Sequence, residues 1–136
     1  GFIDPALAGK FPEKYPKDAL AERGEVVVET LADDQIFEGV ARHPGRFAVM
    51  QSHYEEVKHV PEPFVNLARS AMSEVQLIKV PGVPVYGMAF HPERGWDSTQ
   101  GSAHDLNGAK RLLANFVAMA AEHKRLHRSA WARHCR

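Results

Sequence analysis

The chain has 136 residues, 44% of them hydrophobic, and its 17 lysines and arginines balance its 17 aspartates and glutamates. This length is typical of a single domain, and the moderate, balanced charge excludes a wholly disordered chain. No apolar run approaches the roughly 20 residues of a membrane-spanning helix. The single cysteine, Cys135, excludes an internal disulfide framework and a cysteine-rich zinc site.

The N-terminal region, residues 1–24, contains three prolines together with Gly9 and Gly24, which predict an irregular segment with at most a short helix near residues 18–23. The sequence begins with Gly1 rather than methionine, so we expect an N-terminus that was cut, processed or engineered. The first residues show no basic region followed by an apolar stretch, as a secretory signal would. We therefore expect a cytoplasmic protein.

Short strands are predicted through the middle of the chain. The β-branched run of residues 25–31 favours a strand, and residues 33–40 resemble a short helical turn with an aspartate at its start and a glycine near its end. A second, apolar strand is expected at residues 47–51, followed by a polar loop at 52–57. Apolar residues at positions 64, 67 and 68 have helical spacing, which predicts a short helix over residues 64–70.

Two further strands, at residues 75–80 and 83–90, precede a predicted helix that begins at Gly108. Apolar residues at positions 109, 112, 113, 116, 117 and 120 form the stripe of a helix packed on a core. Residues 122–136 contain five lysines and arginines against Glu122, which predicts a basic helical tail. Such a tail is either simply solvated or a basic patch for nucleic acid or an acidic partner.

A histidine and a carboxylate follow the strand at residues 83–90. His91 and Glu93 are two residues apart, and positions i and i+2 of an extended chain point to the same side. A carboxylate beside an imidazole fixes its tautomer and favours its protonated form. The pair could therefore supply the base and its orienting group in nucleophilic catalysis, or be a structural or surface pair.

The segment Tyr-Gly-Met-Ala-Phe-His-Pro-Glu at residues 86–93 resembles the C-terminal motif of class I, triad-type glutamine amidotransferases. Three other features follow the family's order. Residues 49–53 resemble its strand ending in Ser-His, and residues 63–70 its proline followed by Leu-Ala-x-Ser. The helix from Gly108, with Leu112, Leu113, Asn115 and Phe116, resembles its closing helix. The resemblance covers roughly residues 25–120.

The resemblance implies a mechanism and a site. In this family a cysteine thiolate attacks the side-chain amide of glutamine, a glutamyl thioester forms, and ammonia leaves for a synthetase partner. His91 would be the general base and acid, and Glu93 would orient its imidazole. The loop Ser52, His53 and Tyr54 would lie near the bound glutamine.

We expect no metal and no cofactor. His123 and His127 could share a metal ion, but no third ligand converges on them.

This sequence departs from the family in its nucleophile. The family's cysteine lies on a Gly-x-Cys-x-Gly turn upstream of the matched motifs, and no such turn is present here. Cys135 follows the closing helix, and Ala89 replaces the usual glutamine two positions before the histidine. We therefore expect the isolated chain to be inactive. The alternatives are a non-catalytic binding or assembly module and a fragment of a related γ-glutamyl hydrolase.

The fold expected from the resemblance is α/β: the C-terminal part of a flavodoxin-like, mainly parallel sheet flanked by helices, with a small antiparallel element. Residues 25–121 would form this partial amidotransferase-like domain, between the irregular residues 1–24 and the basic tail at 122–136. Glutamine is the expected substrate. We also expect a homo-oligomer or a second chain that supplies the N-terminal half, and neither a membrane nor a nucleic acid as partner.

Overall fold

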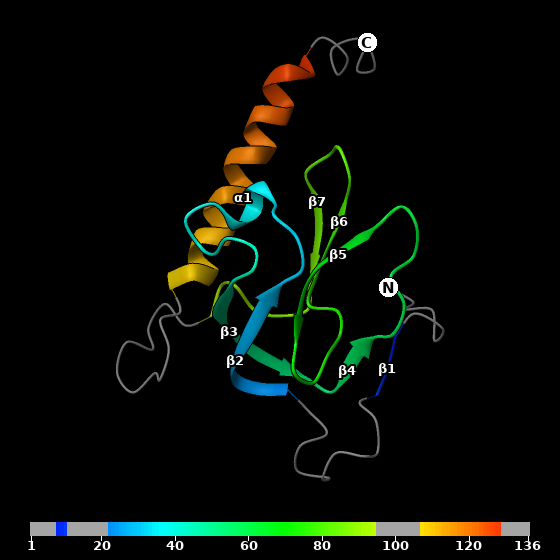
Figure 1. Cartoon of the computed structure of the whole chain (residues 1–136). Helices are drawn as coiled ribbons and strands as arrows, with labels where there is room; N and C mark the ends of the chain where they lie inside the picture. Colours follow the sequence, from blue (N-terminus) through cyan, green and yellow to red (C-terminus); the bar gives the residue numbers. More distant parts are fainter. Residues whose placement is uncertain (1–7, 11–21, 95–106, 129–136) are drawn as a thin grey trace.

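The computed structural model describes residues 8–10, 22–94 and 107–128, which form short strands and one long helix (Figure 1). The elements, in chain order, are β1 Ala8–Lys10, β2 Glu22–Thr30, the 3-10 helix η2 Gln35–Phe37, β3 Arg46–His53, β4 Glu55–Val57, β5 Val65–Ser70, β6 Leu77–Val80, β7 Val85–Met88 and α1 Asn107–Leu126.

Five strands form one sheet in the order β3-β2-β5-β6-β7, and β1 pairs separately with β4. Every pairing between these strands is antiparallel. The prediction of a mainly parallel sheet is therefore wrong for the described residues, although the chain does combine a sheet with a helix. The physical reason lies in the connections, because parallel neighbours need a crossover of a dozen or more residues, usually through a helix, and no helix separates β5, β6 and β7.

The sheet curls until its first and last parts meet. After β7 the chain turns back toward β3, and an isolated antiparallel bridge joins Met50 to His91. The backbone N–H of His91 donates to the carbonyl of Met50 at 2.9 Å. Since β3 is an outer strand of the five, one of its edges pairs with β2, and this bridge lies on its other edge. The curl encloses the apolar core on one face of the sheet.

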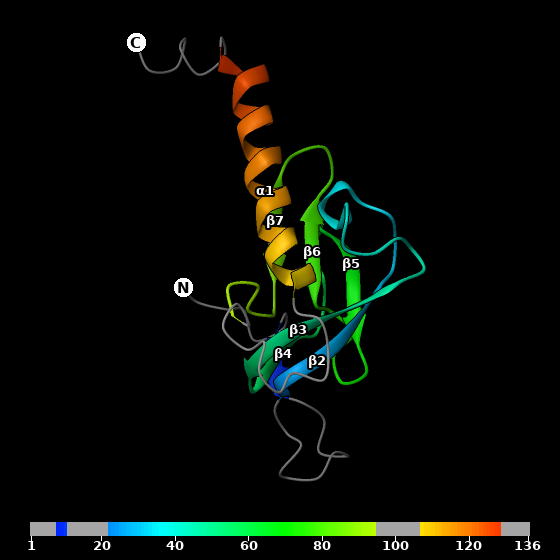
Figure 2. The same ribbon diagram turned by 90° about the vertical axis from the view of Figure 1, so that its left-hand side faces the viewer.

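The core is built from side chains of the sheet, η2 and the first half of α1. Its members are buried apolar residues: Val28, Ile36, Phe37, Phe47, Val49, Leu67, Ala68, Leu77, Phe90, Ala109 and Leu112. Helix α1 packs against β3 and η2, while its C-terminal half extends beyond the strands in both views (Figures 1 and 2). Asn115 fixes the helix by donating from Nδ2 to the carbonyls of Ile36 and Glu38, each at 2.8 Å.

A buried carboxylate links η2 to the sheet. Asp34 caps η2 by accepting from the N–H of Ile36 at 3.0 Å, and it also accepts from the Tyr86 hydroxyl at 2.7 Å and from Lys79. Burial is the largest influence on Asp34 and raises its pKa, but these hydrogen bonds together hold the pKa below its usual value. Burial and the adjacent Asp34 raise the pKa of Tyr86. The helical turn expected at residues 33–40 is thus confirmed, with its aspartate cap.

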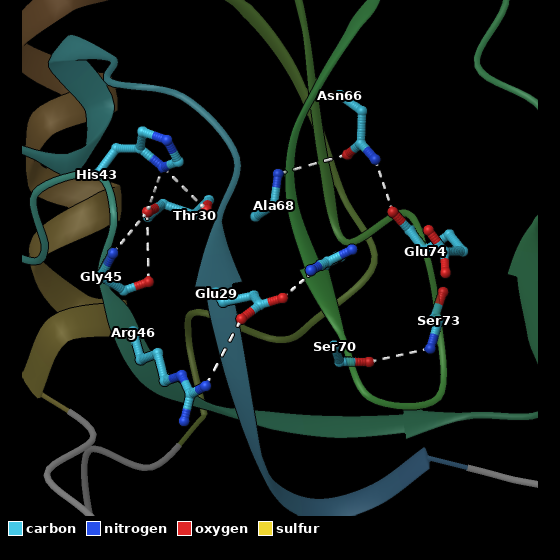
Figure 3. Close-up of polar contacts among 11 residues, drawn as sticks. Glu29, Thr30, His43, Gly45, Arg46, Asn66, Ala68, Ser70, Ser73 and Glu74 are labelled. Atoms are coloured by element: carbon cyan, nitrogen blue, oxygen red, sulfur yellow. Dashed lines mark hydrogen bonds and ion pairs between the residues drawn. The ribbon is translucent and has the colours of Figure 1, made fainter.

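The four strands and the final helix expected from the sequence are present, with bounds that differ by a few residues. The helix predicted over residues 64–70 is wrong, because this stretch is the strand β5. A register shift lies between Asn66 and Ala68 and turns Leu67 and Ala68 both inward. Asn66 supports this bulge by accepting from the Ala68 N–H and donating to the Glu74 carbonyl (Figure 3). Because Leu67 and Ala68 are consecutive and both buried, the apolar positions of this strand have the spacing of a helix, which explains the wrong prediction.

The polar loop predicted over residues 52–57 is also largely wrong. Ser52 and His53 complete β3, and Glu55–Val57 forms β4. The short helix predicted near residues 18–23 falls mostly outside the described residues, but Glu22 and Arg23 lie in β2. None of the helices among the described residues is long and apolar enough to cross a membrane.

Candidate functional site

His91 and Glu93 lie together on the turn that follows β7. The His91 Nδ1 is 2.8 Å from a Glu93 carboxylate oxygen, and the His91 carbonyl accepts from the N–H of Arg94 at 3.1 Å to close the turn. Pro92 between them cannot donate to a strand ladder, which ends the extended chain at this point. The pair that the sequence predicts is therefore formed locally, with both side chains on one side of the turn.

The geometry leaves one imidazole nitrogen of His91 available for chemistry. Because an ionised carboxylate only accepts hydrogen bonds, the Nδ1 of His91 carries the proton, and the Nε2 of the neutral ring has a lone pair. Glu93's own backbone N–H and then His91 hold the pKa of the Glu93 carboxyl below its usual value. The Nε2 makes no hydrogen bond within the described residues. This arrangement can accept and return a proton at a defined atom.

The pair lies at the surface. The His91 side chain is 33% exposed and that of Glu93 is 56% exposed. Three surface hollows of about 380, 450 and 660 Å³ are lined by other residues, and neither member of the pair lines any of them. The described residues thus present the imidazole on an open surface and do not enclose a substrate around it.

The strand β3 brings Ser52 toward this surface. Partners in an antiparallel bridge point to the same face of a sheet, so the side chains of Met50 and His91 share a face. Ser52 is two residues beyond Met50 and is exposed on that same face. Tyr54 is also exposed, and the Arg23 guanidinium lies over its ring at 4.5 Å. No hydrogen bond links Ser52 or Tyr54 to His91 among the contacts of the described residues.

His53 points the other way, into the end of the core. Its Nε2 lies 3.0 Å from Glu22 Oε2, and its Nδ1 contacts the carbonyl of Glu55. Both ring nitrogens therefore face acceptors, which suits a doubly protonated imidazolium. The Glu22 hydrogen bond is the main cause of a raised His53 pKa. The sequence motif groups His53 with Ser52 and Tyr54, but the structure places it in a different environment.

A buried polar cluster that sequence reasoning missed surrounds this histidine. Glu22 accepts from His53, from the Ser70 hydroxyl and, at 2.6 Å, from Gln76 Nε2. Gln51 Nε2 in turn donates to Gln76 Oε1 at 2.6 Å. Burial raises the Glu22 pKa most strongly, but the three hydrogen bonds together hold it below its usual value. Alternation could have placed Gln51 and His53 on the inner face of β3, but nothing local in the sequence pairs them with Glu22.

His123 near the end of α1 and His127 just after it contact each other. The rings of His123 and His127 stack with centroids 4.2 Å apart, and His127 Nδ1 contacts the carbonyl of His123. No group of three or more histidine, cysteine, aspartate or glutamate side chains is arranged to hold a metal ion in the described part of the chain.

Comparison with curated proteins gives relatives that include glutamine-hydrolyzing GMP synthase subunits. The chain is 34% identical over 116 residues to a glutamine-hydrolyzing GMP synthase subunit of Pyrococcus abyssi, an alignment that covers 85% of this chain and 55% of the relative. It is 42% identical over 92 residues to the corresponding subunit of Methanothermobacter thermautotrophicus, covering 68% of this chain and 43% of the relative. The chain thus spans about half the length of these relatives. No family model matches it.

Solved structures show the same fold. A protein of Thermoplasma acidophilum, provisionally assigned as a subunit of GMP synthase, superposes with a TM-score of 0.66 at 24% identity, covering 89% of this chain and 51% of that one. A glutamine amido transferase of Methylobacillus flagellatus superposes with a TM-score of 0.57 at 16% identity, covering 82% and 55%. At these identities the structures establish the fold alone.

The class resemblance carried by the four motifs is therefore confirmed: the chain is related to the class I glutamine amidotransferases and matches part of their length, consistent with a C-terminal portion. Within that class, the curated sequences that it resembles include glutamine-hydrolyzing GMP synthases and glutamine-hydrolyzing subunits of GMP synthase.

Proposed function

We propose that this chain carries the His-Glu part of a Cys-His-Glu site that hydrolyses the side-chain amide of glutamine to glutamate and ammonia. The observation that carries the proposal is the 2.8 Å contact between His91 Nδ1 and Glu93, which leaves Nε2 as the base. The sequence relationship to glutamine-hydrolyzing subunits supports the reaction class. The thiolate comes from outside these residues, because Cys135 follows the closing helix.

In the proposed reaction, the proton that is transferred in each step moves through His91 Nε2. His91 Nε2 takes the proton of the cysteine thiol, the thiolate attacks the amide carbon of glutamine, and the imidazolium donates that proton to the departing nitrogen, so ammonia leaves and a thioester remains. His91, now neutral, takes a proton from water as the water attacks the thioester, releasing glutamate and the thiolate. Glu93 keeps the Nδ1 proton in place and stabilises the imidazolium that precedes the loss of ammonia and forms again as the thioester is hydrolysed. Ser52 and Tyr54, with the backbone of this loop, contribute to glutamine binding.

The experiment needs the thiolate, so the nucleotide sequence upstream of Gly1 is read first, and any longer, thiolate-bearing form that it encodes is the one assayed. Ammonia and glutamate release from glutamine are measured on that form. His91→Ala should lower kcat by about 100- to 10,000-fold, the usual contribution of a general acid-base group. His59→Ala, at another exposed histidine, is the matched control and should leave kcat unchanged.

Two outcomes contradict this proposal. One is a longer form whose kcat is unaffected by His91→Ala. The other is ammonia release by the 136-residue chain alone that His91→Ala abolishes, which would show that no outside thiolate is needed.

We propose further that the chain works with a second polypeptide. Its relatives are named as subunits of GMP synthase, and subunit naming indicates assembly. A binding or assembly module without catalysis is the competing function, favoured by the missing Gly-x-Cys-x-Gly turn.

Size-exclusion chromatography with light scattering should show an oligomer or a complex. A complex without glutaminase activity, together with a start codon directly before Gly1, would favour the competing function.

A further inference from the structure

Two buried glutamines join the strands that hold the His91 segment. Gln51 and Gln76 are 2% and 1% exposed, and their side-chain amides are linked by the 2.6 Å bond from Gln51 Nε2 to Gln76 Oε1. Gln76 Nε2 continues the chain of hydrogen bonds to Glu22 at 2.6 Å and to the Ser70 hydroxyl at 2.9 Å. This glutamine pair thus connects β3 to the residue just before β6.

Both backbone tethers of the His91 segment end on this pair or next to it. The N–H of Ala89 donates to the Gln76 carbonyl at 3.0 Å, and the N–H of His91 donates to the carbonyl of Met50 at 2.9 Å. Met50 directly precedes Gln51. Between the tethers, the Phe90 side chain is 4% exposed and packs edge-on against Phe47 with centroids 6.1 Å apart. Besides the sheet pairings, the hydrogen bond between the Gln51 and Gln76 side chains therefore links the two acceptors directly.

Glu93 alone does not place the imidazole relative to the rest of the molecule. It lies on the same turn as His91, so it orients the ring but moves together with it. The position of the ring relative to a substrate held by β3 depends on the backbone at residues 89–91. We propose that Gln51 and Gln76 are positioning residues that fix this backbone, and with it the His91 imidazole. The proposal rests on the proposed function of His91.

The composition of the glutamine pair supports a geometric role over simple core stabilisation. Gln51 Oε1 is buried and has no hydrogen-bond partner among the described residues. An unsatisfied buried carbonyl is destabilising, and an apolar pair of similar volume would avoid that penalty. What an apolar pair would lack is the directional link between the two strands.

The first test measures backbone amide hydrogen exchange in the 136-residue chain. Gln76→Met and Gln51→Met each remove the directional link while keeping a similar length. We expect the Ala89 and His91 amides to exchange at least ten-fold faster in either variant, with the central amides of β2 unchanged. Gln35→Met, at an exposed glutamine of η2, is the matched control and should change neither set.

The proposal is overturned if the His91 amide exchanges at the parent rate in both variants. Uniform acceleration across β2 as well, or loss of the fold in both variants, also overturns it, because the pair would then serve the whole fold and not this segment.

The second test uses the longer, thiolate-bearing form. Gln76→Met should lower kcat by about ten-fold with KM nearly unchanged, since small displacements of a catalytic group cost rate. A parent kcat in Gln76→Met overturns the positioning role. If His91→Ala leaves kcat intact, the proposed function fails instead, while the exchange experiment still decides whether the glutamine pair holds the segment.

Discussion

Two histidine-glutamate pairs among the described residues have nearly the same hydrogen-bond distance but opposite environments. His91 and Glu93 are two residues apart on an open turn, with side chains 33% and 56% exposed. His53 and Glu22 are 31 residues apart in sequence, joined by the β2–β3 pairing, with side chains 18% and 1% exposed. Their separations are 2.8 and 3.0 Å. Burial and neighbours, and not contact distance, distinguish the two pairs.

The difference indicates two kinds of use. In the inner pair both nitrogens of His53 face acceptors, and Glu22 is held by three donors, so the protons are fixed and the pair contributes to structure. In the outer pair the contacts of the described residues engage Nδ1 of His91 and leave its Nε2 without a structural partner. A histidine suited to proton transfer is one whose second nitrogen is left without a structural partner.

The largest expected difference between the pairs is in folding stability. Glu22→Leu leaves the amide of Gln76 and the hydroxyl of Ser70 without their buried acceptor, so it should reduce the free energy of unfolding by about 3 kcal/mol. The same substitution in the outer pair, Glu93→Leu, should change it by no more than about 0.5 kcal/mol, as for most surface positions. Urea denaturation followed by circular dichroism measures both. Equal losses would remove the distinction drawn between the pairs.

The second expected difference between the two pairs, smaller than the first, is in how folding stability depends on pH. The His53 pKa is raised by Glu22, so its contribution is complete below the unfolded value of about 6.5 and is lost as pH rises through the folded value. The hydrogen bonds of Glu22 lower its pKa despite its burial. The contribution of Glu22 to folding stability is therefore complete above the unfolded pKa of about 4.3, and it is lost as the pH falls through the folded value.

The excess stability of the parent chain over a Glu22→Gln, His53→Gln double variant should therefore be greatest between about pH 4.5 and 6.5. It should decline on either side by at most about 1.4 kcal/mol per pH unit for each proton. Denaturation midpoints at several pH values test this. The corresponding double variant of His91 and Glu93 is the control, and a similar pH profile in both would contradict the assignment.

The smallest expected effect concerns the tautomer of the exposed ring. Removing the carboxylate by Glu93→Ala takes away the acceptor that keeps the proton on His91 Nδ1. The population of the Nε2-protonated ring should rise, while the free energy of unfolding stays within about 0.5 kcal/mol of the parent. Ring nitrogen chemical shifts measure this population. An unchanged tautomer ratio would show that Glu93 does not orient the imidazole.

The outer pair could be predicted from the sequence because its geometry is local. A strand pattern ending at Pro92 and a spacing of two residues suffice to bring His91 and Glu93 together. The inner pair could not be predicted, since the contact between His53 and Glu22 depends on the register of two distant segments. That register follows from the pairing of the whole of β2 with β3, which no single residue determines.

The errors in the fold have equally specific causes. The bulge at Asn66 and Ala68 interrupts strand alternation in β5, so its buried residues imitate a short helix. The expectation of a mainly parallel sheet came from the family domain as a whole, whereas the connections from β5 to β6 and from β6 to β7 are too short for parallel crossovers. The long helix α1 was predictable because its apolar stripe repeats over several turns.

The bridge between Met50 and His91 has a consequence beyond catalysis. An outer strand with unpaired backbone groups can recruit a strand of another molecule and begin aggregation. At this point on β3 the N–H of His91 takes the carbonyl that such a strand would use. The turn that presents the imidazole therefore also occupies this point of the edge strand, so backbone changes there would open it to pairing with a strand of another molecule.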